Sequence, residues 1–322
     1  MGIKHLNKFL QDSCNDSIKK IHISSLSGKK IVIDTSIYLY RFIGDGCLLE
    51  NFYLMISIFH QYNIIPIFIF DGKPPKEKEE LLKQRKMEKK EAEIKYKILE
   101  DKLTNNVDDG INIVEIKDNM DLLKKQFIRI HHTDIENVKT LIKAYGVSYI
   151  EANEEADKLC AKMVCKHKAY ACLSEDMDLF VYGCSRVLRY LSLLKKTAIM
   201  YDLAGILSEI NMTLKEFQEV TVISGTDYNC NIKHNNNLMT TLKYFKKYKK
   251  HNKNNLIDFY HWLKINTNYI DDFDELNRII DMFSLSNMIE YKDYENIKIA
   301  NGPIHISNLK MVMEKEHFVF ID

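Results

Sequence analysis

The sequence predicts an α/β protein with a mostly parallel central sheet and helices on both faces. Short β-branched runs alternate along the chain with segments long enough for crossover helices, which is the pattern of a helix-covered parallel sheet. The predicted strands cover residues 31–33, 64–70, 147–150, 169–173, 187–191 and 198–201.

A long charged helix is predicted between the second and third strands, over residues 81–103. It has too few apolar positions for a packed stripe, so it is expected to project from the body. An irregular stretch over 104–119 should follow, and a further helix should lead back near Arg129. Residues 73–125 are therefore predicted to form a charged helical arch, although such a run alone is more often a solvated face with Glu/Lys pairs.

The chain divides into two predicted parts. Residues 1–230 form a core with the sheet and the arch, and residues 231–322 form a helical lobe. No Pro/Gly-rich linker separates them, so the lobe is expected to be an appendage of the core. Trp262, Tyr269 and Phe273 are predicted to be core residues of this lobe.

The net charge of +1 gives no argument for nucleic acid, but the charges are unevenly distributed. Residues 73–102 hold eleven Lys/Arg against eight Asp/Glu, and residues 233–253 hold seven Lys and no acid. Two local basic regions are therefore candidates for contact with phosphates.

The seven cysteines are scattered and form no Cys-x-x-Cys pair, which indicates reduced thiols. Neither a secretion signal nor an apolar run of membrane-spanning length is found in the sequence. We therefore expect a soluble, intracellular protein that is not secreted and has no membrane partner. The Lys, Asn and Ile bias suits an A/T-rich genome, such as that of a large DNA virus.

Acidic residues follow several predicted strands or begin the helices after them. In a parallel sheet these positions share one edge, where ligands bind. The helix whose first turn holds Glu155 and Asp157 has an apolar face containing Leu159 and Met163. Thr213 and Glu216 would form a capping box at the start of the helix before the last acid. The seven candidates are Asp34, Asp71, Glu155, Asp157, Asp176, Asp178 and Asp227.

Each acid alone has an ordinary structural explanation. Acids are favoured in the first turn of a helix and in the turns that follow strands. Together they are costly, because two carboxylates 4 Å apart repel by about 4 kcal/mol at an effective dielectric near ~20. An all-oxygen set without clustered His or Cys selects Mg²⁺ or Mn²⁺ over Zn²⁺. Two such ions would activate water against a phosphodiester, with Lys73, Lys78 and Arg85 as nearby cations.

Six motifs carry a resemblance to a known family. In order they are Met1-Gly-Ile-Lys, Ile33-Asp-Thr-Ser-Ile-Tyr-Leu-Tyr, Phe70-Asp-Gly-Lys-Pro-Pro, Ala152-Asn-Glu-Glu-Ala-Asp, Ser174-Glu-Asp-Met-Asp and Gly225-Thr-Asp-Tyr. Over roughly residues 1–230, this set resembles the flap endonucleases, five-prime nucleases that remove branched DNA ends.

The resemblance implies a site in which the seven acids hold two Mg²⁺ ions per chain, with Mn²⁺ able to substitute. It implies that Lys78 and Arg85 act on the scissile phosphate and that Tyr40 stacks on a base beside the cut. Gly2, freed by removal of Met1, would lie near the substrate. The arch would surround a single-stranded five-prime end.

The sequence departs from the family in three places. The region 229–237 lacks the glycine-containing hairpin that grips duplex phosphates, so the grip is expected to rest on a lysine group. Asp157 stands where the family usually has Glu, and the C-terminal residues show no sliding-clamp peptide, so clamp binding is not expected. The lysine group comprises Lys243, Lys246, Lys247, Lys249 and Lys250.

The leading hypothesis is a monomeric nuclease for flapped or branched DNA that serves replication, repair or recombination in the nucleus or at a cytoplasmic viral site. The same chemistry could instead prefer four-way junctions or bubbles. A catalytically silent DNA-binding scaffold is the alternative from another class. His131 and His132 are predicted to lie in a surface turn with Thr133 as helix N-cap, and not to bind metal.

Overall fold

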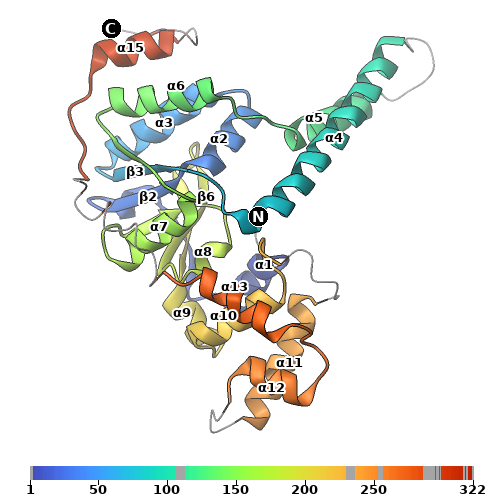
Figure 1. The fold of residues 1–322 in the computed structure, drawn as a ribbon. Coiled ribbons are helices and arrows are strands. Elements are labelled where there is room, and N and C mark those ends of the chain that lie inside the picture. The colour runs from blue at the N-terminus through green and yellow to red at the C-terminus, as the bar shows by residue number, and fades with distance from the viewer. Residues whose placement is uncertain are drawn as a thin grey trace.

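The computed structural model describes residues 3–105, 113–229, 236–252, 257–285, 294, 297, 299–314, 316 and 318–320. Within these residues, the strands form one seven-stranded sheet of order β1-β7-β6-β5-β2-β3-β4 (Figure 1). The strands are β1 (Ile18–His22), β2 (Lys30–Asp34), β3 (Ile65–Phe70), β4 (Ser148–Glu151), β5 (Ala171–Leu173), β6 (Arg186–Ser192) and β7 (Thr197–Asp202).

The predicted α/β fold with a mostly parallel sheet is confirmed. Strands β2 to β6 pair in parallel, whereas β7 and β1 add an antiparallel edge. Strand β1 was not predicted, because this edge strand has a half-exposed surface and two lysines in place of a continuous apolar run. Charged residues on an edge strand discourage pairing with other chains.

The helices are α1 (Leu6–Ser13), α2 (Thr35–Gly44), α3 (Leu48–Gln61), α4 (Glu79–Asn105), α5 (Ile113–Gln126), α6 (His132–Ala144), α7 (Ala156–Cys165), α8 (Asp178–Val181), α9 (Leu203–Glu209), α10 (Leu214–Ile223), α11 (Leu238–His251), α12 (Phe259–Asn266), α13 (Phe273–Met282) and α15 (Ile306–Glu314). Short 3-10 turns cover Ile23–Leu26 and Lys76–Lys78.

Two apolar layers cover the faces of the sheet, because side chains alternate along each strand. In β2, Ile31 and Ile33 belong to a core cluster with residues of α2, α3, α6 and α15, whereas Val32 belongs to a second cluster with residues of α1 and of α7 to α13. Each fully buried Ile or Val contributes about 1.5–3 kcal/mol to stability. The strand ends are thereby fixed, and with them the residues that follow each strand.

Helices α4 and α5 project together from the body as the predicted arch (Figure 1). The prediction of an irregular stretch over 104–119 is wrong in part, because α4 continues to Asn105 and α5 begins at Ile113. The apolar side of α5 consists of the half-buried Ile116, Met120 and Leu123, a stripe too narrow to stand out in the sequence.

The chain after residue 230 goes to two places. Helices α11, α12 and α13 pack on α10, below the sheet in Figure 1, and bury Trp262, as predicted for the lobe. Helix α15 lies instead beside α6 at the opposite end, where Phe318 packs on Tyr53 with ring centres 5.1 Å apart. The division at residue 230 remains a prediction, but α15 belongs to the core packing.

The start of α6 differs from the prediction. His131, and not Thr133, is the N-cap, and its backbone N–H donates to the Asp134 carboxylate at 2.8 Å. Asp134 supplies this acceptor from the third helical position, so the helix begins earlier than a Thr cap would allow. His131 and His132 are exposed, as predicted for a surface turn.

Among the helices that the structure describes, none combines the length and the apolar character needed to cross a membrane.

The packing of α15 on the core gives a stability test with a matched pair. Met313 is fully buried, whereas Met311 on the same helix is 56% exposed. Met313→Ala should lower the free energy of unfolding by about 2–4 kcal/mol, because it leaves a cavity beneath α15. Met311→Ala should change it by less than about 0.5 kcal/mol in the same urea titration. Equal effects of the two substitutions would contradict this packing.

Candidate active site

Six of the seven predicted acids line one cavity of about 270 Å³ at the carboxyl edge of the sheet. The seventh, Asp178, is 1% exposed and interacts electrostatically with Asp176 and Asp227. The cavity is lined by Asp34, Ser36, Ile37, Tyr40, Asp71, Gly72, Pro74, Lys78, Leu82, Arg85, Glu155, Asp157, Asp176 and Asp227. The structure thus brings together acids that are almost 200 residues apart in the sequence.

Sheet topology explains this convergence. The chain runs from β2 outward through β3 to β4, and then returns to place β5 on the other side of β2. The connections on the two sides of β2 therefore diverge and leave a crevice at its carboxyl end. Asp34 ends β2, Asp71 follows β3, and Asp176 follows β5.

Asp34 is the acid closest to the centre of the sheet and is 6% exposed. The Ser174 hydroxyl donates a hydrogen bond of 2.9 Å to its carboxylate. Burial, and next the negative charge of Asp71, raise the pKa of Asp34 to about 8. A nearby cation would reverse this effect, since it favours the ionised carboxylate.

Asp71 follows β3 and contacts the first turn of α7, so it links the two elements. Its carboxylate accepts the first backbone N–H of α7, from Ala156, at 2.8 Å, and it also accepts a hydrogen bond from Ser36. A carboxylate at a helix N-terminus is stabilised by the unpaired N–H groups there. The next residue must be glycine, because a β-carbon at Gly72 would collide with the backbone oxygens of Ala152 and Asn153.

Lys78 is a buried cation among the acids, with a side chain 6% exposed. Its ammonium group pairs with Glu155 at 2.8 Å and lies 4.7 Å from the ring centre of Tyr228. Burial works to lower the pKa of Lys78, but the charge of Asp157 and the neighbouring Tyr228 and Glu155 raise it overall. Lys78 therefore stays charged and offsets part of the acidic charge.

Asp176 and Asp178 are fixed by the turn after β5. The backbone N–H of Asp178 donates to Asp176 at 3.0 Å, and that of Asp176 donates to the Ser174 hydroxyl at 3.1 Å. Burial, and then the charge of Asp176, raise the pKa of Asp178 well above its usual range. One Asp178 carboxylate oxygen, Oδ1, is buried and has no hydrogen-bond partner among the described residues.

A hydrogen-bond network centred on the buried Arg189 stabilises this turn. Arg189 on β6 is 5% exposed and donates to the backbone oxygen of Glu175 at 2.9 Å. Glu175 in turn accepts the backbone N–H of Tyr190 at 2.6 Å, and Arg189 also donates to Asn7. The acids that follow β5 are therefore anchored to β6 and to the N-terminal helix.

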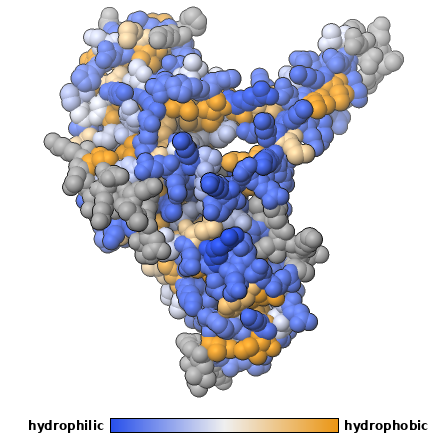
Figure 2. Space-filling view, in the orientation of Figure 1, coloured by the Kyte–Doolittle hydropathy of each residue, from blue (hydrophilic) through white to orange (hydrophobic). Residues whose placement is uncertain are grey.

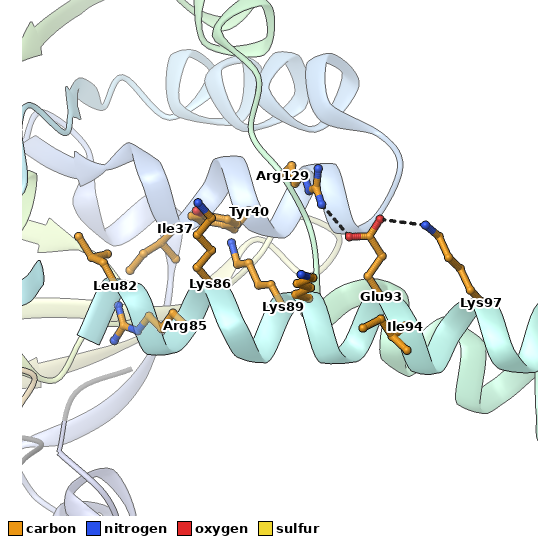
Figure 3. Close-up of a pocket in the computed structure, with 11 residues that line it drawn as sticks. Ile37, Tyr40, Leu82, Arg85, Lys86, Lys89, Glu93, Ile94, Lys97 and Arg129 are labelled. Carbon is orange, nitrogen blue, oxygen red and sulfur yellow. Dashed lines mark hydrogen bonds and ion pairs between the residues drawn. The ribbon is translucent and has the colours of Figure 1, made fainter. Parts of the chain in front are cut away.

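A second, larger cavity opens between α2 and the base of the arch (Figure 3). It has a volume of about 920 Å³, and Arg85 lines both this cavity and the acidic one. Arg85 also pairs with Asp227 at 2.8 Å. Tyr40 is 42% exposed, with the Lys89 ammonium 4.7 Å from its ring centre. The cations that line this passage are Arg85, Lys86, Lys89, Lys90, Lys97 and Arg129.

The remaining predicted DNA contacts lie elsewhere. Lys73 is exposed, although only its neighbours Gly72 and Pro74 line the acidic cavity. Lys243, Lys246 and Lys247 are exposed on α11 and are not part of either cavity described above. Gly2 lies outside the described residues.

The donor set fits a hard divalent cation. All the acids offer oxygen, the ligand that Mg²⁺ and Mn²⁺ prefer, and the unpartnered Asp178 oxygen is a buried acceptor without a donor. In the present side-chain conformations, no three acids, histidines or cysteines among the described residues form a group that could hold one ion. Lys78, Arg85, Ser36 and Ser174 instead engage four of the carboxylates, so ion binding would require some of these to turn.

Comparison with known proteins agrees with the architecture. Residues 1–92 match the XPG N-terminal domain, and residues 146–227 match the XPG I-region. Flap endonuclease 1 of Danio rerio is 32% identical over 247 residues, which cover 71% of this chain and 62% of that protein. Flap endonuclease 1 of Glycine max is 30% identical over 247 residues, with coverages of 71% and 62%. The match thus spans less than two thirds of the length of these relatives.

Solved structures share the fold. The catalytic core of Rad2 has a TM-score of 0.66 at 18% identity, over 98% of this chain and 95% of that chain. Flap endonuclease-1 from Methanococcus jannaschii has a TM-score of 0.60 at 22% identity, over 92% and 90%. The fold and the two matched regions place this chain among the proteins that contain an XPG N-terminal domain and an XPG I-region. It belongs to the flap endonuclease family.

Sequence reasoning missed the neutral residues that hold the acids. Ser36 and Ser174 bond to Asp71 and Asp34, and Tyr228 donates to Glu155 at 3.2 Å. All three lie within the motifs quoted above, beside the acids. Their position in those motifs was the available signal, but only coordinates show which acid each one contacts.

The crowded acids should make the metal-free protein less stable as the pH rises. With a folded-state pKa of about 8, well above the ~3.9 of a free aspartate, Asp34 holds a proton that the unfolded chain releases. The free energy of unfolding should therefore fall between about pH 4 and about pH 8. Asp34→Asn should flatten this dependence and add about 1–2 kcal/mol at the alkaline end.

Urea titrations in chelator-containing buffer at several pH values measure this effect. Asp121→Asn, at an exposed position on α5, is the matched control and should leave the pH dependence unchanged. The interpretation fails if Asp34→Asn retains the wild-type slope.

Proposed function

We propose that this protein is a structure-specific five-prime nuclease that hydrolyses DNA phosphodiester bonds with the help of two Mg²⁺ ions. The observation that carries the proposal is the acidic cavity itself, which adjoins a passage lined by cations and shares Arg85 with it. An acidic site alone would repel DNA. The adjoining cations supply the attraction that phosphates need.

The seven acids would hold the metal ions. Two bound divalent ions supply an activated water and stabilise the charge that develops on the leaving oxygen. Asp34, Asp176 and Asp178 are held by the sheet and its turns, whereas Asp71 and Glu155 reach the cavity from beside α7. An arrangement held by rigid elements favours catalysis, because the reacting groups need little reorganisation.

Lys78 and Arg85 would bind the scissile phosphate. Each now pairs with an acid, Lys78 with Glu155 and Arg85 with Asp227. Both cations would have to leave these acids to meet an incoming phosphate, and the acids would then be able to hold a metal ion. Tyr40 supplies an exposed ring beside the same cavity, suited to stacking on a base.

The passage between α2 and α4 suits a single strand. Its lining includes Ile37, Leu82 and Ile94 beside the lysines, so it offers apolar surface to bases and charge to phosphates. Flap endonuclease 1 is the printed name of the sequence relatives, and Rad2 was solved in complex with a DNA substrate. These likenesses support a flapped or branched DNA as substrate, and hence action at sites of DNA replication.

Replacing one buried acid tests catalysis. Asp178→Ala should lower the single-turnover rate of Mg²⁺-dependent flap cleavage by at least ~100-fold, because it removes a ligand from the metal site. DNA affinity should stay within about two-fold, since Asp178 is 1% exposed and is not among the residues that line the cavity. The assay uses a flap labelled at its five-prime end, with nicked, gapped and four-way DNA alongside.

Asp12→Ala is the control, because Asp12 is exposed on α1 and lines neither the acidic cavity nor the passage. It should cleave at the wild-type rate. Salt-dependent DNA binding without any product, over a titration of Mg²⁺ and Mn²⁺, would instead support a silent scaffold.

Charge reversal in the passage tests how the single strand binds. Lys86→Glu should weaken binding of a flap with a single-stranded tail by about 3–10-fold and make its salt dependence shallower. Lys102→Glu, near the far end of α4 and outside the passage, should have a smaller effect. Fluorescence anisotropy at several salt concentrations measures both, and equal losses on a tail-less nicked duplex would argue against the passage.

A further inference from the structure

The residues that follow α13 contact Tyr228, a neighbour of the acidic site. Phe283 is 1% exposed and is the C-cap of α13. Its ring meets the ring of Tyr228 edge to face, with centres 5.2 Å apart, and the ring of Tyr182 at 4.9 Å. Edge-to-face aromatic pairs have a preferred geometry, so they orient their partners as well as bury them.

Tyr228 is the point where this aromatic cluster meets charged groups. Its hydroxyl donates to Glu155 at 3.2 Å and lies 3.2 Å from the hydroxyl of Tyr182. The ammonium of Lys78 lies 4.7 Å from the centre of its ring. The Tyr228 ring therefore lies on one side of the Lys78 ammonium, and Phe283 packs against this ring.

A second contact ties the same segment to the helix that carries Asp157. Lys162 on α7 is 7% exposed, and its ammonium donates to the backbone oxygen of Leu285. The three residues after α13 thus touch both α7 and Tyr228. Within the described residues, this segment is the part of the lobe in direct ring contact with a neighbour of Lys78.

We propose that Phe283 is a positioning residue, which holds the Tyr228 ring and through it directs Lys78 toward the scissile phosphate. The inference rests on the proposed nuclease function. The lysine side chain is flexible, and without a fixed Tyr228 ring beside it the Lys78 ammonium would distribute among the surrounding carboxylates. The lobe formed by α11 to α13 would then contribute to the chemical step through Phe283.

A double-mutant cycle tests this coupling. Phe283→Leu keeps an apolar side chain but removes the ring edge that meets Tyr228. It should slow single-turnover flap cleavage at saturating DNA and Mg²⁺ by about 3–10-fold, the size of an aromatic pair contribution. The dissociation constant for the flap should stay within about two-fold. In a Lys78→Ala background, the same Phe283→Leu change should alter the residual rate by less than about two-fold.

Phe273→Leu is the matched control, because Phe273 begins the same helix but packs against Tyr260 and His261 and not against Tyr228. It should cleave at the wild-type rate. If Phe283→Leu does not fold, Phe283→Met, whose longer and flexible side chain adapts better to the space left by the ring, carries the same comparison.

Three outcomes would overturn the inference. Wild-type cleavage by the Phe283 variant would show that the ring is not needed. Equal losses with and without Lys78 would show a general structural role. A wild-type protein that makes no product with Mg²⁺ would overturn the inference together with the nuclease function, and this result is distinguishable because it appears before any Phe283 substitution.

Discussion

The mutual repulsion of buried carboxylates is the constraint on which the rest of this structure depends. Asp34, Asp157 and Asp178 are each less than 9% exposed, and burial with neighbouring charge raises the pKa of all three. Surplus buried acids cost stability unless partners compensate them. The protein supplies such partners in Lys78 and in the hydrogen-bond donors of the adjacent turns, and the remaining imbalance is what a divalent ion would remove.

The clustered acids also determine the position of the arch formed by α4 and α5. Lys78 closes the short turn before α4, and Arg85 lies in the second turn of α4. Their ion pairs with Glu155 and Asp227 therefore attach the base of the arch to the acidic cavity. Most of α4 beyond this base is charged and exposed, and in Figure 2 the projecting helices are largely hydrophilic with an apolar stripe along them. The geometry of the site and the position of the arch thus depend on the same two contacts, which substrate or metal would have to break.

Sequence reasoning reached the sheet and the seven acids because both leave local marks. Parallel strands such as β3 are apolar runs, and an acid that follows such a run is visible without coordinates. Prediction failed where the sequence pattern is weak or the contact is non-local. Strand β1 is a lysine-bearing edge strand, and α5 has only a narrow apolar stripe. Helix α15 packs on α6, from which it is far apart in the sequence. The support of the site by Arg189 and Glu175 was likewise invisible, because two charged residues on a strand and in a turn give no sign of burial until they meet.

The departure over residues 229–237 concerns duplex contact, where the geometry is least constrained, whereas the departure at Asp157 keeps the carboxylate on a shorter side chain. Metal-binding acids must converge to within a few ångströms, so little variation is tolerated among them. Contact with duplex phosphates depends mainly on the presence of charge and tolerates changes in backbone. Helix α11 supplies such charge, but Lys249 pairs with Glu216 at 2.9 Å in the capping box of α10. The proposed duplex contact therefore rests on the exposed Lys243, Lys246, Lys247 and Lys250, while Lys249 holds the lysine-rich helix against the core that carries Asp227.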